Sequence, residues 1–513
     1  MKRLLYLIIG IAAFSACTNL DEEIYSKLAK DNFFISEEAF VTYSARAYAA
    51  LQDWATEQSY WTFDIQVGDE VCVPLNPAGD WDNSGRYREI QTHQLQNSNK
   101  LLLMAWEYCF NGISACNDVL DVFESAKTEF DGKAKAIAEV KIMRAYFYFM
   151  AICYWKEVPY APKKDIKNYP EKKDRAFIFN FIEKEIKDNI DLLNVKPTTE
   201  SYGRVTRGVA EFLLAKLYLN AEFLTGDKNR WADAEAACKD IMTNNNGGSY
   251  YSLENNYKDL FKVHNENSPE GILVIPYSTV YTKSDHYAFI IYMSTLPADL
   301  CAPMGIAAKA WDGLVAQPDF MASYEAGDIR KEATWIYGQQ YDLDGNPLSI
   351  TIDGASVPYI IDPDFPESAL KERRTALQGA RIGKWEYQSD GTLTGGQVSM
   401  ENDFYIMRYA DVILMYLEAV IRQGKTTADA DALAAFDKIR TRAGLAPIPF
   451  TSLTLDKLYQ ERSHELAVEG WHRQDMIRFG KYLEKWWNKD VKTAEDYDLP
   501  MPYEAIAANP KLK

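Results

Sequence analysis

The sequence predicts a mainly α protein, in which a scaffold of repeated helix pairs is interrupted by long loop-rich insertions with short β-hairpins. Apolar residues recur with the 3.6-residue period of helices in three segments, and two of these segments have a second periodic segment after them. Residues 57–100 and 244–405 lack this period and are rich in aromatic residues, Gly, Pro, Asn and Asp. We therefore expect the helical scaffold over about residues 24–56, 101–243 and 406–513.

The N-terminus has the pattern of a secretory signal. A basic pair precedes thirteen uncharged, mostly apolar residues, fewer than the ~18 expected of a membrane-spanning helix. Small residues before Cys17 resemble a bacterial lipobox, so we predict that residues 1–16 are removed and that Cys17 carries lipid. The acidic residues 21–23 resemble a surface-export tag. An ordinary signal peptide that happens to end in Cys is the alternative. The mature chain, 17–513, is predicted to be a single domain held at a membrane by lipid alone.

The predicted scaffold helices pair with one another. Three helical faces comprise Ala138, Ile142, Ala145, Phe149 and Ile152; Val209, Leu213, Leu217 and Leu224; and Ile406, Ala410, Ile413, Leu417 and Val420. Partner helices carry Trp231, Ala234, Cys238 and Ile241 after the second face, and Ala432, Ala435, Phe436 and Ile439 after the third. Alanines at the expected crossings permit close approach. Antiparallel pairs that recur in this way indicate tetratricopeptide-like hairpins with longer loops than a regular repeat.

The two irregular regions are expected to be ordered. Residues 272–275 read as a short strand, and Asp344-Gly345-Asn346, between Tyr341 and Leu348, is a hairpin signal. A loop-rich segment of this length is usually either disordered or functional, and its aromatic content argues against disorder.

Composition limits the partners. The formal net charge of −18 argues against nucleic acid and anionic lipid, since both require clustered Lys and Arg. The 33 Tyr, 23 Phe and 12 Trp residues serve either a core or stacking surfaces. The six cysteines after Cys17 form no CxxC motif and read as buried apolar residues; a disulfide is possible but cannot be assigned.

The common catalytic and metal motifs are absent from the sequence. His464-Glu465 begins like a zinc-protease helix, but Val468 stands where the second His is needed, so we predict no metal and no cofactor. Asp342 and Asp344 suggest a calcium loop, but the later Glu is missing at the required spacing, and a hairpin turn is favoured. Carboxylate pairs of the glycosidase type cannot be singled out among 74 acidic residues. We therefore expect a protein without enzymatic activity.

Three C-terminal segments carry a resemblance to a known family. Residues 408–419 (RYADVILMYLEA), 439–444 (IRTRAG) and 461–478 (ERSHELAVEGWHRQDMIR) resemble the signatures of the SusD/RagB family of nutrient-binding outer-membrane lipoproteins, with the order of residues 471–474 shuffled. Residues 203–219 and 144–159 are weaker matches. The resemblance implies a SusD-like fold with the ligand face on the irregular insertions.

The last of these segments is rich in charge. On what we expect to be one helical region, Arg462 and Glu465, and Asp475 and Arg478, place opposite charges three residues apart, and Glu469 follows Glu465 by four. A buried charge needs a partner, so we interpret the group as a structural network rather than an acid–base site.

The resemblance also implies a function and a partner. Family members capture a nutrient, often a glycan, at the cell surface and pass it to a SusC-like TonB-dependent outer-membrane transporter. Sugar rings stack on Trp and Tyr, and their hydroxyl groups bond to Asp, Asn and Arg, so neither a metal nor a perturbed acid is required.

Candidate ligand residues follow from chemistry and from rough family position. In the first irregular region Trp81 is the first choice for stacking, with Asn83 and Arg86 as hydrogen-bond donors and Asp69 nearby. The alternative for Trp81 is packing against the scaffold.

Tyr281, Tyr287 and Trp311 are the candidates in the second region, and a core role for Trp311 is equally compatible with the sequence. Tyr60 and Trp61 are weaker candidates.

Two other functions remain open at this stage. A surface lipoprotein that hydrolyses glycans would show turnover. A helical-repeat adaptor that binds only protein would show no change in tryptophan emission with glycans.

Overall fold

The computed structural model describes residues 37–55, 59–127, 129, 132–164, 168–243, 248–282, 289–306, 308–389 and 399–513. The predicted signal peptide, Cys17 and the acidic residues 21–23 lie outside the described residues.

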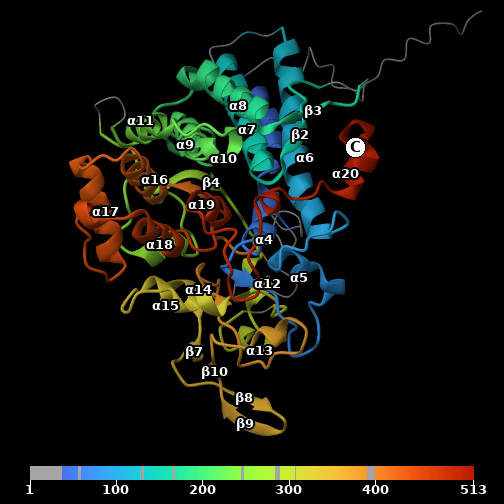
Figure 1. Cartoon of the computed structure of the whole chain (residues 1–513), viewed down its shortest axis with the longest axis vertical. Coiled ribbons are helices and arrows are strands. Elements are labelled where there is room, and N and C mark those ends of the chain that lie inside the picture. Colours follow the sequence, from blue (N-terminus) through green and yellow to red (C-terminus); the bar gives the residue numbers. More distant parts are fainter. Residues whose placement is uncertain are drawn as a thin grey trace, which may run out of the picture.

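Antiparallel helices form the upper part of the molecule (Figure 1). The longer helices are α3 (Glu37–Ala49), α6 (Lys100–Ser125), α7 (Lys133–Tyr154), α8 (Arg175–Asn189), α9 (Arg207–Leu219), α11 (Trp231–Thr243), α16 (Tyr409–Arg422), α17 (Ala430–Arg442) and α18 (Leu455–Glu465). Helix α7 packs against α6 and α8, α9 against α11, α11 against α16, and α16 against α17 and α18. This chain of neighbouring pairs is the mainly α, tetratricopeptide-like scaffold that the periodicity predicts.

Local sequence explains how these helices begin and pack. Asp174 accepts a hydrogen bond from the amide of Phe177 at 2.8 Å and caps α8, and Asp429 caps α17 in the same way. Gly112 allows α6 to approach α7 closely, because a Cβ at this position would lie 2.5 Å from the ring of Phe147.

Three details differ from the predicted helices. Ile406 lies in strand β12 (Phe404–Arg408), because α16 begins only at Tyr409. The second predicted face is divided at Asn220, where α9 gives way to the short α10 (Ala221–Thr225). Helix α18 ends at Glu465, and residues 466–471 form turns in which Val468 and Gly470 have φ of 55° and 86°. The signature segment is therefore not one helical region.

The irregular regions contain short helices and paired strands. The short helices are α4 (Tyr60–Asp64), α5 (Arg86–Gln91), α12 (Ile291–Thr295), α13 (Ala298–Cys301), α14 (Pro318–Ala322) and α15 (Arg330–Thr334), and α19 (His472–Arg478) and α20 (Tyr503–Ala508) follow near the C-terminus. The described strands form antiparallel pairs: β1 (Val71–Cys72) with β5 (Val315–Ala316), β2 (Glu157–Pro159) with β3 (Lys172–Asp174), β4 (Gly271–Ile275) with β12, β6 (Trp335–Ile336) with β11 (Arg381–Ile382), β7 (Gly338–Gln339) with β10 (Ile360–Ile361), and β8 (Ser349–Ile352) with β9 (Ala355–Pro358).

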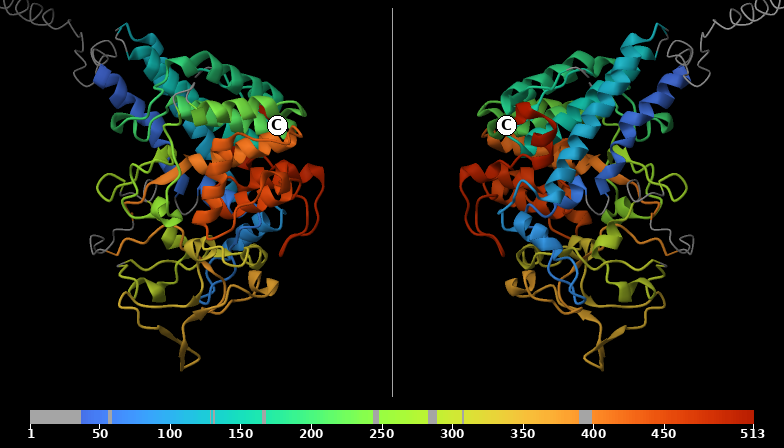
Figure 2. Two further views of the ribbon diagram at one scale, coloured as in Figure 1. Left: turned by 90° about the vertical axis from the view of Figure 1, so that its left-hand side faces the viewer. Right: turned by 90° about the vertical axis from the view of Figure 1, so that its right-hand side faces the viewer.

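The predicted turn at Asp344-Gly345-Asn346 is present. Tyr341 pairs with Pro347, and the carboxylate of Asp342 accepts from the amides of Asp344 and Asn346. The longer hairpin, β8–β9, turns at Asp353-Gly354 instead and extends from the end of the molecule opposite the helical layers (Figure 2).

The C-terminal segment joins distant parts of the chain. The carbonyl of Val468 accepts from the indole N–H of Trp61 at 2.6 Å, across 407 positions, and its amide donates to Glu70 at 2.7 Å. Trp471 donates to the carbonyl of Ile406. The turns at 466–471 thereby connect the scaffold to the N-terminal irregular region.

The six described cysteines are buried and form no disulfide with one another, and their burial confirms the prediction that they act as small buried residues. They are Cys72, Cys109, Cys116, Cys153, Cys238 and Cys301. Within the described ranges, no helix is both long enough and apolar enough to cross a membrane.

Candidate ligand-binding site

A cavity of about 580 Å³ lies where four segments meet, within the range of typical ligand pockets. The segments are the loop after β1, the start of α13, the residues before Gly313, and the loop before β11 at Ala376. The lining residues are Asn76, Pro77, Ala78, Asp80, Trp81, Asn83, Pro297, Ala298, Asp299, Ala310, Trp311, Asp312 and Ala376. Three sequence candidates, Trp81, Asn83 and Trp311, therefore come together although 230 positions separate the two tryptophans.

The backbone of Trp311 is fixed from both sides. Its amide donates to the carbonyl of Met293 at 2.7 Å, and its carbonyl accepts from the indole of Trp81 at 2.7 Å and from Asn76 at 3.4 Å. The Trp311 residue nevertheless remains 38% exposed. The backbone of Trp311 is therefore held in place, while its ring can contact a ligand.

Asp312 is held beside Trp311 by two buried arginines. Its Oδ1 contacts Arg374 at 2.5 Å and Arg381 at 3.0 Å. Burial, together with neighbouring Arg381, lowers the pKa of Arg374 to about 10, so this guanidinium is still charged at neutral pH. The arginines orient one carboxylate oxygen inward and leave Asp312 on the cavity wall.

Several residues at the cavity have a positive backbone φ, which residues other than glycine rarely adopt. Trp81, Asn83 and Asp312 have φ of 73°, 42° and 55°, and Ser84 beside them has φ of 59°. Such strain persists only where the surroundings enforce it, and it concentrates at functional sites. This clustering marks the cavity without reference to any relative.

Trp81 lines the cavity, but most of its side chain is buried. The residue is 9% exposed, its ring centroid lies 5.4 Å from that of Tyr87, and a Cβ on Gly313 would fall 2.3 Å from its Cε2. Its indole N–H is already bonded to Trp311. Trp81 is therefore mostly buried and supports the backbone that presents Trp311, so Trp311 is the more exposed of the two rings.

Other sequence candidates lie outside the lining. Arg86 is turned toward the carbonyl of Asn83 at 3.2 Å. Asp69 bonds instead to His472 at 2.6 Å, and Tyr281 is 88% exposed without lining the cavity. Tyr287 lies outside the described residues.

Tyr60 and Trp61 are fully buried core residues, which overturns their candidacy as ligand contacts.

Sequence reasoning missed two polar residues of the cavity. The side chains of Asp80 and Asp299 are exposed there and make no hydrogen bond or ion pair with the described part of the chain. Asp80 stands directly before Trp81 and could have been found, whereas Asp299 has no sequence signal.

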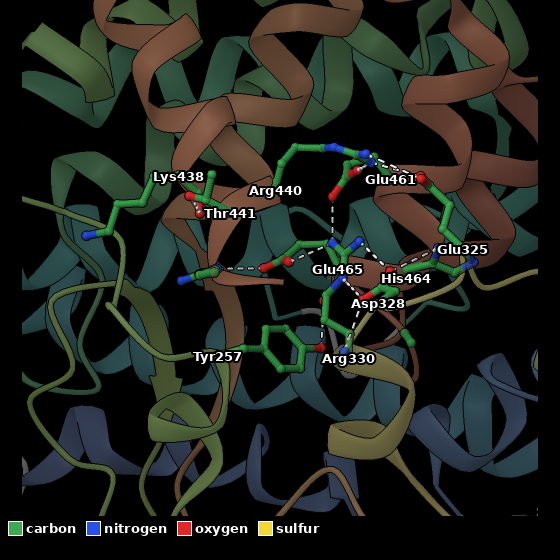
Figure 3. Close-up of polar contacts among 12 residues, drawn as sticks. Tyr257, Glu325, Asp328, Arg330, Lys438, Arg440, Thr441, Glu461, His464 and Glu465 are labelled. Atoms are coloured by element: carbon green, nitrogen blue, oxygen red, sulfur yellow. Dashed lines mark hydrogen bonds and ion pairs between the residues drawn. The ribbon is translucent and has the colours of Figure 1, made fainter. Parts of the chain in front are cut away.

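A second polar cluster, the buried ion network, shares no residue with the cavity lining. Figure 3 shows part of it around Glu465. Its cations are Arg330, Arg408, Arg440, Arg442 and Lys384, and its anions are Glu270, Asp328, Glu461, Glu465 and Glu469. Glu465 contacts Arg442 at 2.6 Å, Arg408 at 2.8 Å and Arg330 at 3.1 Å.

Glu465 remains ionised in this network. Burial alone would raise its pKa, but Arg442, Arg408 and Arg330 hold the pKa well below its ordinary value. The predicted structural role of the charged signature is thus confirmed, although the partners of Glu465 come from other segments rather than from i+3 and i+4 neighbours. Asp475 does pair with Arg478, at 2.6 Å, and also with Arg462.

The two signature histidines are packed side chains. The ring of His464 stacks on Tyr324 at 4.0 Å, and burial followed by nearby Arg330 lowers its pKa to about 3. Burial alone would lower the pKa of His472, but Glu70 and Asp69 raise it to about 9. No group of His, Cys, Asp or Glu in the described ranges is arranged to hold a metal ion.

Comparisons with known proteins agree with this architecture. The model of the SusD family matches residues 219–511, and a model described as "Starch-binding associating with outer membrane" matches residues 18–219. The chain belongs to the SusD family. As a SusD-family member it is associated with the outer membrane, as the second description states.

Some relatives of this SusD-family chain are named as glycan-binding or starch-binding proteins. A SusD-like protein of Bacteroides ovatus is 26% identical over 94% of this chain and 83% of its own length. The starch-binding protein SusD of Bacteroides thetaiotaomicron is 24% identical over 68% of this chain and 66% of its own. The surface glycan-binding protein A of Bacteroides thetaiotaomicron, solved with laminarihexaose, superimposes with a TM-score of 0.72 at 21% identity, over 92% of this chain and 97% of that chain.

Proposed function

We propose that this protein captures a glycan at the cell surface in the cavity beneath Trp311 and does not cleave it. The observation that carries the proposal is the exposed indole of Trp311, presented on a fixed backbone beside side chains that have no partner within the described structure: Asp80, Asn83 and Asp299. Glycan-binding relatives of the same family support this function.

The chemistry of the cavity suits a sugar. The C–H face of a pyranose ring packs against an indole, and its hydroxyl groups bond to carboxylates and amides. Because the backbone of Trp311 is already held by hydrogen bonds, little of its conformational freedom is lost when a ligand binds.

We also propose that Cys17 carries the lipid anchor and that the captured glycan passes to a SusC-like TonB-dependent transporter. The lipobox-like sequence and the family membership support these two steps. Cys17→Ala should release the protein from the membrane or leave it unprocessed, and normal membrane retention would contradict the anchor. Replacing residues 21–23 with Ala should retain the anchor but reduce protease shaving of whole cells.

Titration calorimetry on the purified protein tests the glycan proposal. The panel comprises laminarin, soluble starch, xylan, galactomannan, polygalacturonate and alginate. Trp311→Ala should weaken binding by about 1–3 kcal/mol, an estimate taken from stacking of nucleic-acid bases on aromatic side chains. Tyr503→Ala removes another exposed aromatic residue, 61% exposed on α20, and should change nothing.

The proposal fails if the folded protein binds no member of the panel. It also fails if Trp311→Ala and Tyr503→Ala bind equally well. Turnover of a bound glycan by the purified protein would favour a hydrolase instead.

A further inference from the structure

We infer that the cavity selects glycans that lack acidic groups, and that Asp80 and Asp299 are the residues that reject uronic-acid and sulfated sugars. This inference rests on the proposed function and deepens it by naming the class of glycan.

The charged groups on the cavity wall have one sign. Asp80, Asp299 and Asp312 line it, and no Lys, Arg or His of the described chain does so. Asp80 and Asp299 are exposed, and neither carboxylate is neutralised by a described side chain. An acidic ligand would meet two unpaired negative charges directly.

The cations close to the lining residues in sequence or space are not themselves part of the lining. Arg374 and Arg381 have fully buried side chains that bond to Asp312 and to backbone carbonyls, so they cannot reach a ligand. Arg373 lies over Gly79, where a Cβ would be 2.6 Å from its Nη2, and Gly79 does not line the cavity. Lys309 is exposed next to Ala310 but is also absent from the lining.

Hydrogen-bonding capacity points to the same class. The unpartnered oxygens of Asp80 and Asp299 only accept hydrogen bonds when ionised, and the indole N–H of Trp81 is already used. Asn83 supplies the one side-chain amide of the wall whose N–H groups have no partner among described residues. A neutral sugar donates through its hydroxyl groups to these carboxylates, whereas a carboxylate or sulfate could bond only to the few free donors of the described wall, the Asn83 amide and the indole N–H of Trp311.

A matched pair of polymers tests the inference. Laminarin and soluble starch are each measured before and after their C6 hydroxymethyl groups are oxidised to carboxylates, with EDTA present so that no divalent ion bridges the charges. If neither polymer binds, the neutral panel member that does bind is oxidised in the same way. Oxidation should weaken binding to the wild type on the order of tenfold or more, and more at low salt than at high salt.

Two double variants locate the effect. Asp80→Asn/Asp299→Asn should remove most of the oxidation penalty. Asp344→Asn/Asp353→Asn removes the same two charges from exposed turns outside the lining and should leave the penalty intact.

Four outcomes overturn the inference. Equal or tighter wild-type binding of the oxidised polymer does so, as does a panel in which only polygalacturonate or alginate binds, and in both cases the proposed function survives. A penalty of the same size in both double variants refutes the roles of Asp80 and Asp299. If no glycan binds at all, the proposed function fails and the inference fails with it.

Discussion

Neutralising Glu465 should destabilise the protein strongly, since this carboxylate is bonded to three buried arginines. Its side chain and those of Arg330, Arg408 and Arg442 are at most 1% exposed, and the buried ion network balances five cations with five anions. Glu465→Gln leaves five cations facing four carboxylates, and the new amide turns N–H donors toward guanidinium groups that also only donate.

The expected loss is about 3–5 kcal/mol of unfolding free energy, the usual result of breaking one side of a buried ion pair. That is a large part of a total stability of about 5–15 kcal/mol. Glu325→Gln is the matched control, because Glu325 bonds to Arg440 at 2.9 Å but its side chain is 49% exposed. This control should cost at most about 1 kcal/mol.

Urea denaturation followed by far-ultraviolet circular dichroism and tryptophan emission measures both variants. An insoluble Glu465→Gln beside a soluble Glu325→Gln counts as the predicted loss. Equal urea midpoints for the two variants would refute the reasoning, because burial would then make no difference to how much these charges contribute to the free energy of unfolding.

Further predictions concern the cavity wall, the core and pH. Trp81→Ala should lower the unfolding free energy by about 3–5 kcal/mol. Leu417→Ala, on the buried face of α16, should lower it by about 2–5 kcal/mol. Unchanged stability of Trp81→Ala would show that the Trp81 side chain does not contribute to the packed core. Gly313→Ala should cost about 1–3 kcal/mol by displacing Trp81, and an unchanged tryptophan emission spectrum would contradict that displacement. His472 has a pKa raised from 6.5 to about 9, so its contribution is complete below pH 6.5 and is lost as pH rises through 9. Between pH 7 and pH 10 the wild type should therefore lose about 2–3 kcal/mol more unfolding free energy than His472→Gln, as judged by denaturation of both proteins at the two pH values; the same pH dependence in both would show that His472 is neutral throughout.

The sequence predicted the scaffold well because long amphipathic helices carry a strong periodic signal. Helices α7, α11 and α17 lie where the apolar faces place them. Ile406 was assigned to a helix because β12 is buried on both faces, which hides the alternation of a strand. The β8–β9 turn at Asp353-Gly354 was missed although Asp-Gly is a strong hairpin signal.

The candidate site was predictable only in part. Trp81, Asn83 and Trp311 could be chosen by residue type, but the relative exposure of the two tryptophans depends on Gly313 and on one indole hydrogen bond. The sequence favoured Asp69 as a ligand residue because it gives no sign of the residue that Asp69 actually contacts, His472, which is 403 positions away. Such pairings are set by tertiary packing, which no local pattern records.

The hydrogen bonds between Val468 and the residues Trp61 and Glu70 affect the order in which the protein can fold during synthesis. A ribosome makes the N-terminal irregular region first, yet that region acquires these partners only after nearly the whole chain has been translated. An incomplete polypeptide therefore lacks the contacts that close its core and stays open to chaperones and proteases. If the predicted secretory signal is used, late closure of this contact leaves the polypeptide unfolded enough to be exported until synthesis ends.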